Sequence, residues 1–403
     1  MVGLLPAELW EYRLGDLVHG LAAVLGRRKL NGMFDIDGVG SCISARSGRA
    51  ALIAAIKALN LPPGARIGVP LYCCPVVFKA IKATGCTPRF IDVELETSCM
   101  SADDLSAKRS EVDAVIAVHM FGNLCDISSL QEAAQGRPII EDCAQSIGSK
   151  IDGRMAGSLG TIAVFSFRSG KYLSVGEGGA LFSNHAEIRT RLSKLIGELP
   201  SNSRTEECAH IAKTYIRSML RSKPLYGLIG HTMWSIYNKT VDYSAQTPIV
   251  LSQIFRSDLA ITLKRLPLLD YAIEGQRANA EFYSRNLKLD SCMLFSEKPG
   301  TFYNRYLYPI ILPSSKHRDL IAAYLRSRQI DTVKPYKDIA DVAATHYGYT
   351  GDCPVAEQIA KRVLVIPSNY SLKKKVVQHI AECLNTGWRE IESRNRSSCL
   401  YPR

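Results

Sequence analysis

Helical and strand-like patterns alternate through the first half of the chain. Apolar residues recur at helical spacing between residues 50 and 59 and again between residues 76 and 84, and Pro62-Pro63-Gly64 ends the first of these helices. Several short stretches rich in apolar and β-branched residues have the length of buried strands; they are residues 66–70, 89–93, 113–120, 137–142 and 160–167. The alternation predicts an α/β fold with a mostly parallel sheet, whose ligands gather at the carboxyl ends of the strands.

The chain divides into three predicted parts. Residues 1–40 form an N-terminal arm with a short amphipathic helix, residues 41–255 a large α/β domain, and residues 256–403 a smaller C-terminal α+β domain. In the last part, a helical stretch from 259 to 286 breaks near Pro267. Further elements there are a strand over residues 306–312 and helices over residues 318–328 and 376–384.

Residues 195–250 interrupt the alternation within the large domain. Between Ile211 and Tyr237, basic residues mix with apolar and aromatic ones, and Pro224 breaks the pattern. The segment is either an ordinary helical insertion packed on the domain, or a lid, a substrate contact or a membrane-surface element.

Composition and charge narrow the classes of function. A chain of 403 residues with a 46% hydrophobic share can bury a large core. The net charge of +12 is either simply that of a basic soluble protein or an attraction to anionic ligands such as phosphates and sugar nucleotides. We find no RNA-binding signature, no recognition-helix pattern and no apolar stretch of membrane-spanning length, so neither a nucleic-acid partner nor an integral membrane segment is expected.

The twelve cysteines are scattered, and several, such as Cys73 and Cys143, lie in or beside apolar runs. In a chain of this length they predict reduced thiols and a cytoplasmic location, not a disulfide framework. No Cys/His set has zinc spacing, so no metal is expected. The first residues lack the basic head, apolar run and cleavage site of an export signal.

Asp142 and Lys171 carry the candidate chemistry. Asp142 ends the strand 137–142, and Lys171 follows the strand 160–167 after a Ser-Gly turn, so both are expected at the carboxyl edge of the sheet. A lysine amine can form a Schiff base with the aldehyde of pyridoxal phosphate, while a carboxylate keeps the pyridine nitrogen protonated. Taken singly, Asp142 reads as a helix cap or structural ion pair and Lys171 as a surface charge.

Further residues are candidates for the same site. Ser47-Gly48-Arg49 opens a helix whose free N–H groups can bind a phosphate, and Ser166 is a second candidate phosphate contact. Gln145 could contact the ring hydroxyl or hold Asp142, and His119 could line the pocket. The alternative readings are a plain helix cap, a buried strand serine and a structural histidine.

Together these segments resemble the DegT/DnrJ/StrS aminotransferases, fold-type-I pyridoxal phosphate enzymes that act on nucleotide-linked keto sugars. The resemblance covers roughly residues 40–385, and the matching strings are residues 47–52, 69–72, 85–93, 118–122, 141–145, 166–179, 277–283 and 363–367. It implies Lys171 as the Schiff-base residue, Asp142 on the ring nitrogen and Gln145 near the ring hydroxyl. It also implies that Gly48, Arg49 and Ser166 hold the phosphate.

The chain departs from the family pattern at three places. The family usually sets an aromatic residue against the cofactor face, where this chain has Cys74; either Tyr72 substitutes or Cys74 itself packs on the ring. The Gly-Tyr-Asn string that reaches the partner subunit's phosphate is absent near residues 240–255, where Ser252 and Gln253 lie. Residues 195–250 are longer than is typical of the family, so the identity of the acceptor substrate, a sugar or a non-sugar, stays open.

The resemblance implies a homodimer with shared active sites, glutamate as amino donor and a keto sugar, nucleotide-linked, as acceptor. Three alternatives stay open: a deoxysugar dehydratase-like enzyme, a non-sugar aminotransferase, and a non-catalytic cofactor-binding regulatory protein. Dehydratase relatives carry histidine in place of the lysine, so Lys171 argues against the first.

Overall fold

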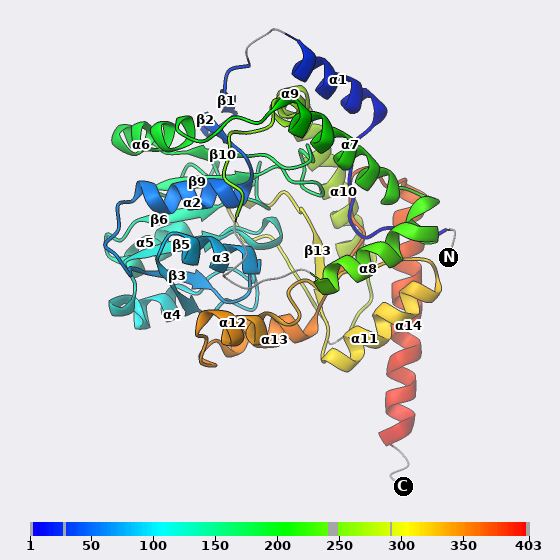
Figure 1. Cartoon of the computed structure of the whole chain (residues 1–403). Helices are drawn as coiled ribbons and strands as arrows, with labels where there is room; N and C mark the ends of the chain where they lie inside the picture. Colours follow the sequence, from blue (N-terminus) through cyan, green and yellow to red (C-terminus); the bar gives the residue numbers. More distant parts are fainter. Residues whose placement is uncertain (1–2, 27–29, 241–248, 291, 400–403) are drawn as a thin grey trace.

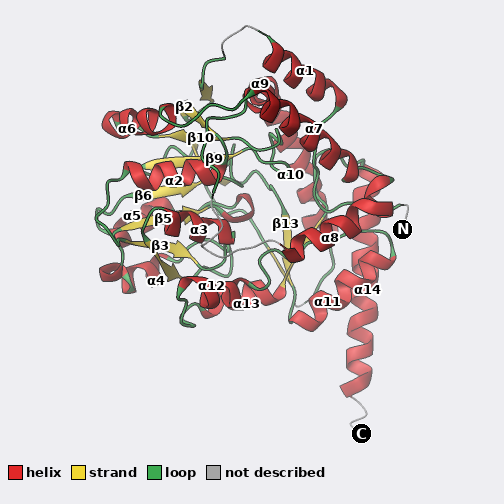
Figure 2. Cartoon of the chain, in the orientation of Figure 1, coloured by secondary structure: helices red, strands yellow, loops and turns green. Residues whose placement is uncertain are grey.

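An eight-stranded sheet forms the centre of this computed structural model, which describes residues 3–26, 30–240, 249–290 and 292–399 (Figures 1 and 2). Its strands, in order across the sheet, are β1 (Met33–Ile36), β2 (Gly40–Ala45), β10 (Gly179–Phe182), β9 (Ile162–Ser166), β6 (Ile139–Asp142), β5 (Ala114–Val118), β3 (Arg66–Pro70) and β4 (Thr87–Ile91). The strands from β9 to β4 run parallel, whereas β10, β2 and β1 pair antiparallel. The predicted α/β class with a mostly parallel sheet is therefore confirmed.

Helices on the sheet explain why its central strands are buried along their whole length. Every residue of β5 and β6 is buried, as expected of parallel strands covered on both faces. The helices of this part are α2 (Gly48–Ala58), α3 (Pro75–Ala83), α4 (Ala102–Ala107), α5 (Ile127–Ala134) and α6 (Ala186–Gly197), with the short turns η1 (Arg109–Glu111) and η2 (Met120–Gly122). Ser47 caps α2, because its Oγ accepts a hydrogen bond from the Ala50 N–H at 3.2 Å.

The beginning of the chain differs in part from the predicted arm. Helix α1 (Leu14–Leu25) is present, but residues 33–36 form β1, the edge strand of the sheet. Exposed and buried residues alternate along β1, the pattern of a half-buried strand, and four residues are too few to reveal it.

A second, three-stranded antiparallel sheet lies in the later part of the chain. It contains β11 (Met293–Leu294), β13 (Tyr308–Ile311) and β14 (Val363–Ile366), and packs with α10 (Leu269–Asn286), α11 (Ser315–Ser327) and α14 (Lys374–Cys399). A small third sheet joins β7 (Lys150–Ile151) to β8 (Arg154–Met155) and β12 (Thr301–Phe302). Helix α9 (Arg256–Arg265), the turn η4 (Leu266–Leu268) and α10 reproduce the predicted break near Pro267.

Helices α12 (Ile339–Tyr347) and α13 (Pro354–Arg362) belong to the late part of the chain but pack beside α3 and α4 (Figure 1). The rings of Tyr347 and Phe78 lie 5.5 Å apart, and Asp352 forms an ion pair with Arg89 at 2.6 Å. The domain boundary after residue 255 stays a prediction.

The segment after α6 contains further helices, and its role as an insertion or a lid stays a prediction. It comprises α7 (Arg204–Leu220), the π-helical turn η3 (Tyr226–Gly230) and α8 (His231–Thr240); residues 241–248 of the predicted insertion lie outside the described residues. Helix α7 packs on α1 and α9, and Trp234 of α8 meets the ring of Trp10 edge-on at 4.9 Å. No helix in the described part of the chain is long and apolar enough to cross a membrane.

Candidate active site

Lys171 lies in a tight turn after β9, where its amine is surrounded by protein. The Lys171 N–H donates to the Arg168 carbonyl at 2.9 Å, and Gly170 before it adopts a φ of +91° that favours glycine. The Lys171 Nζ lies 4.5 Å from the centre of the Tyr306 ring. Burial, followed by the positive charge of Arg168, lowers the pKa of Lys171 to about 8, so a large share of the amine is neutral near that pH.

Asp142 is the last residue of β6 and faces the same region. The carboxylate is buried, and among the described residues it accepts one hydrogen bond, from the Ala144 N–H to Oδ1 at 3.0 Å. Burial raises the pKa of Asp142, although the Ala144 N–H and the charge of Lys171 oppose this effect. A buried carboxylate with so few donors has capacity for a cationic partner such as a protonated pyridine nitrogen.

The start of α2 meets the end of β9. A Cβ atom added to Gly48 would lie 2.7 Å from the Ser166 Cβ, so only glycine permits this approach. Ser166 is the one residue of β9 that is not buried, and Arg49 is exposed. The first N–H groups of a helix have no helical partner, so the start of α2 offers donors that could bind an anion beside Ser166.

A glycine loop holds these two elements together. A Cβ on Gly179 would lie 2.8 Å from the Gly48 nitrogen, and Gly176 has a φ of +123°. Asp258 of α9 fixes the loop by accepting from the Glu177 N–H at 3.1 Å, and it also contacts His210 at 2.9 Å. The absence of a side chain at Gly179 therefore permits this close approach of the two backbones.

Gln145 is buried beside Asp142, and both ends of its amide have partners. Its Oε1 accepts from the Phe121 N–H at 3.1 Å, and its Nε2 contacts the Met120 sulfur at 3.5 Å. Phe121 has a φ of +61°, which is strained for a residue with a side chain, and this hydrogen bond helps to hold it. A contact of Gln145 with the ring hydroxyl stays a prediction.

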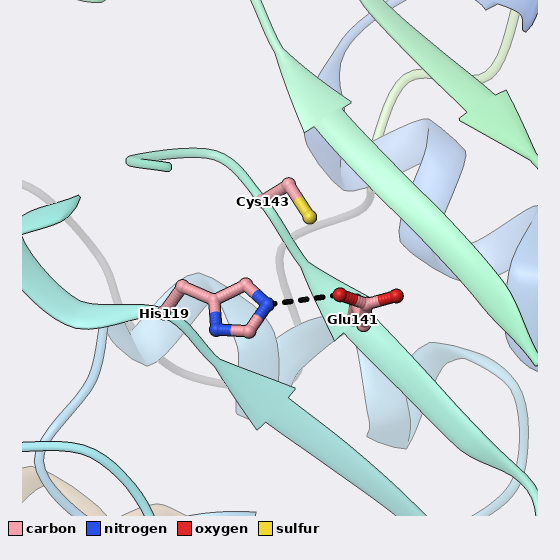
Figure 3. Close-up of side chains that lie close together, drawn as sticks. All are labelled: His119, Glu141 and Cys143. Carbon is pink, nitrogen blue, oxygen red and sulfur yellow. Dashed lines mark hydrogen bonds and ion pairs between the residues drawn. The ribbon is translucent and has the colours of Figure 1, made fainter. Parts of the chain in front are cut away.

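His119 and Glu141 form a buried pair behind the strand ends (Figure 3). The His119 Nδ1 accepts from the Cys125 N–H at 3.1 Å, which places the ring proton on Nε2, 3.1 Å from Glu141. Glu141 also accepts from backbone N–H groups after β8, including that of Leu159 at 2.8 Å. Both ring nitrogens of His119 are thus engaged, and its predicted place along the pocket stays a prediction.

Cys143 lies close enough to His119 and Glu141 that the three could be metal ligands (Figure 3). However, both oxygens of Glu141 and both ring nitrogens of His119 already have hydrogen-bond partners. Burial raises the pKa of the Cys143 thiol well above its usual value, which keeps it protonated. A metal would have to replace several of these bonds, so we assign the group a structural role.

The two candidates for the cofactor face are placed differently. Tyr72 is fully buried, its hydroxyl donates to the Pro335 carbonyl at 3.2 Å, and its ring lies 5.7 Å from that of Tyr336. Cys74, at the start of α3, is half-buried and is among the groups that influence the pKa of Lys171. Which of the two lies against the cofactor face stays a prediction.

The structure adds three residues around Lys171 that the sequence patterns did not reveal. The Tyr306 hydroxyl donates to the Gly170 carbonyl at 2.9 Å, which keeps the Tyr306 ring against Lys171. Arg168 precedes Lys171 in the same turn, and Glu8 of the N-terminal arm lines the pocket that contains Lys171. Of these three residues, only Arg168 lies within a sequence motif, residues 166–179, that could have placed it near Lys171.

The model of the DegT/DnrJ/EryC1/StrS aminotransferase family matches residues 32–210 and 242–385. The chain therefore belongs to this family of aminotransferases, and the resemblance inferred from the motifs is confirmed.

Two curated relatives and one solved structure illustrate the likeness. GDP-perosamine synthase of Escherichia coli O157:H7 is 27% identical over 342 residues, covering 84% of this chain and 83% of that protein. UDP-N-acetyl-3-dehydro-alpha-D-glucosamine 3-aminotransferase of Acidithiobacillus ferrooxidans is 28% identical over 383 residues, which cover 91% of this chain and 90% of that protein. The fold is similar to that of the aminotransferase TlmJ from Streptoalloteichus hindustanus, with a TM-score of 0.74 and 21% sequence identity. The match covers 96% of this chain and 100% of that one.

Proposed function

We propose that this aminotransferase uses pyridoxal phosphate and glutamate to convert a nucleotide-linked keto sugar into an amino sugar. The observation that carries the proposal is the half-buried Lys171 in the turn after β9, with its Nζ 4.5 Å from the centre of the Tyr306 ring, a pKa lowered to about 8, and the buried Asp142 among the charges that act on it. Two relatives named for amino-sugar reactions support the substrate class.

The residues around Lys171 fit the cofactor from its aldehyde to its phosphate. Lys171 would attach the cofactor covalently, Asp142 would bond to the pyridine nitrogen, and Gln145 would lie near the ring hydroxyl. Gly48, Arg49 and Ser166 would bind the phosphate at the start of α2, where the helix N-terminus favours negative charge. The Cβ-free approach at Gly48 supports this placement.

When bound, pyridoxal phosphate supplies an electron sink that stabilises negative charge on the α-carbon of the amino donor. Lys171 would then move the proton from that carbon, because an amine with a pKa near 8 can both accept and return a proton near neutral pH. The negative charge of Asp142 would keep the pyridine nitrogen of the cofactor protonated.

We further propose a homodimer whose active sites are shared between subunits. Exposed apolar side chains on η3 and α8 are of the kind that subunit contacts cover; they are Leu228, Ile229, Met233 and Ile236. The contact of the partner subunit with the phosphate, and a cytoplasmic location, stay predictions.

The proposal is tested by supplying purified enzyme, loaded with pyridoxal phosphate, with glutamate and a panel of keto sugar nucleotides. We expect repeated release of oxoglutarate with at least one acceptor, and no release from Lys171→Ala. A deoxysugar dehydratase would consume the keto sugar without transferring nitrogen. A regulatory protein would stop after one equivalent of glutamate, and that result would overturn the proposal.

The same enzyme tests the lysine assignment directly. Borohydride should fix the cofactor irreversibly to the wild-type chain, and peptide mass analysis should find it on residue 171. Survival of a coloured, borohydride-trappable form in Lys171→Ala would exclude Lys171 as the attachment point.

A further inference from the structure

Residues 211–241 lie between the two stretches of the chain that the family model matches, so the family match does not account for this segment. Its described part comprises the second half of α7, the turn η3 and α8, which follow one another as a bent helical pair (Figure 1). The sequence from residue 208 to residue 240 contains no aspartate or glutamate, and its lysines and arginines are Lys213, Arg217, Arg221, Lys223 and Lys239. The segment is therefore a basic feature that the family reaction does not explain.

The inner side of these helices is attached to the rest of the chain. The Ser218 hydroxyl of α7 donates to the Trp10 carbonyl at 2.5 Å and accepts from the Tyr12 N–H at 3.1 Å. In α8, the His231 Nδ1 accepts from the Arg326 guanidinium at 2.9 Å. These bonds fix which side of α7 and α8 faces the chain and which side faces outward.

The outward side of both helices is apolar, whereas the exposed side of a surface helix is usually polar. On η3 and α8, Ile229, Met233 and Ile236 recur at spacings of four and three residues, which places them on one face. Exposed apolar side chains that are grouped in this way, unlike single ones, mark an interaction surface. Together with the exposed Lys213 and Lys223, the large apolar side chains that are 40–60% exposed here form what we call the α7–α8 surface; they are Ile216, Met219, Leu228, Ile229, Met233 and Ile236.

We propose that the α7–α8 surface docks on a membrane that contains anionic lipids. Amphipathic helices bind a membrane surface by burying apolar side chains at the level of the lipid headgroups, while lysines and arginines attract anionic headgroups. The α7–α8 surface offers both kinds of side chain on consecutive elements. The net charge of +12 would also draw the whole enzyme toward such a membrane.

A second copy of the chain is the other candidate for covering these apolar side chains, and charge favours the lipid. In a symmetric contact the same surface of each copy meets the other, so basic residues would lie near basic residues and repel. The sequence from residue 208 to residue 240 supplies no acidic residue to neutralise them. The homodimer proposed above needs no contact through this segment, because the residues that the family model matches lie outside it.

Cosedimentation of the full chain with lipid vesicles tests the docking without any substrate, so its result is independent of the proposed reaction. We expect binding to vesicles made of equal parts of phosphatidylglycerol and phosphatidylcholine, binding at least about tenfold weaker to pure phosphatidylcholine, and loss of binding at high salt. Lys213→Gln and Lys223→Gln should each weaken binding about fivefold, the effect of one basic residue near such a surface. Lys57→Gln, at an exposed lysine of α2, is the matched control and should change binding by less than about twofold.

A second set of variants tests the apolar side chains without changing the charge. Ile229→Gln combined with Ile236→Gln should weaken vesicle binding at least about tenfold, because both side chains would enter the headgroup region. Leu320→Gln, at an exposed leucine of α11, is the matched control and should leave binding unchanged. All of these variants should keep the denaturant midpoint of the wild type, since the replaced side chains are exposed.

Absence of wild-type binding to the anionic vesicles would overturn the inference, and so would equal binding to pure phosphatidylcholine. Binding that neither the lysine variants nor the double isoleucine variant weakens would belong to another surface and would also overturn it. If vesicle binding is absent and the double isoleucine variant turns a dimer into a monomer in ultracentrifugation, the α7–α8 surface is a subunit interface instead.

Discussion

The Lys171 side chain is expected to lower the free energy of unfolding of the cofactor-free protein at neutral pH. Burial, and then the charge of Arg168, lower the pKa of Lys171 from 10.5 to about 8. The unfolded chain therefore binds this proton more tightly than the folded one. Taking 10.5 minus about 8 as a difference of about 2.5, at about 1.36 kcal/mol for each pKa unit, gives a cost of about 3 kcal/mol.

Lys171→Met removes this cost, because methionine has a similar length and no charge. Well below pH 8 both states of the wild type are protonated and the full cost applies. Between pH 8 and 10.5 the folded state has lost the proton that the unfolded state still binds, so the cost falls as the pH rises and has nearly disappeared at pH 10.5. We expect the variant to be more stable than the wild type by up to about 3 kcal/mol at pH 7, and equal to it near pH 10.5.

Denaturant unfolding of cofactor-free protein at both pH values measures this difference. Lys57→Met, at an exposed lysine of α2, is the control and should show no such dependence on pH. A Lys171→Met variant that is less stable than wild type at both pH values would refute the reasoning.

Three further predictions concern the cofactor site and its support. Asp142→Asn should reduce transamination about 100-fold in steady-state assays, since the ring nitrogen loses its anionic partner; a near-normal rate would refute that role. Gly48→Ala places a Cβ 2.7 Å from the Ser166 Cβ and should weaken cofactor binding at least about tenfold by fluorescence titration; an unchanged Kd would contradict the phosphate assignment. Glu141→Gln should lower the free energy of unfolding by about 2 kcal/mol, because a buried amide cannot accept every bond from His119 and the backbone; a loss below about 0.5 kcal/mol would contradict this.

The parallel half of the fold was predictable because each of its strands is a compact apolar run. The strand predicted at 137–142 is β6, and that at 160–167 contains β9. The antiparallel edge was missed, because β1 is four residues long with alternating burial and β10 follows a glycine turn. Short half-buried strands take their stability from neighbours that are distant in the sequence.

The candidate site divides in the same way. The positions of Asp142, Ser166 and Lys171 were predictable because the first two end parallel strands and Lys171 follows one, and the carboxyl ends of these strands meet at one edge. Tyr306 and Glu8 reach Lys171 from the late part of the chain and from the arm, so no local pattern marks them.

The pairing of His119 with Glu141 also depends on folding. His119 directly follows β5 and Glu141 lies in the neighbouring parallel strand β6, and the register that pairs Val118 with Asp142 brings them together. A histidine after one strand and a glutamate at the end of the next is the signal that could have found this pair.

The packing of α12 and α13 on α3 bears on how small molecules enter and leave. Asp352 joins Arg89 and Lys108 to this late segment, so moving the late segment as a whole away from the sheet would break several ion pairs at once. The arm lines the pocket around Lys171 through Glu8, and its own ion pairs, such as that of Asp16 with Arg265 at 2.7 Å, attach it to α9. Breaking the Asp16 pairs is therefore expected to accelerate the release of ligands without changing the contacts of α12 and α13 with the sheet.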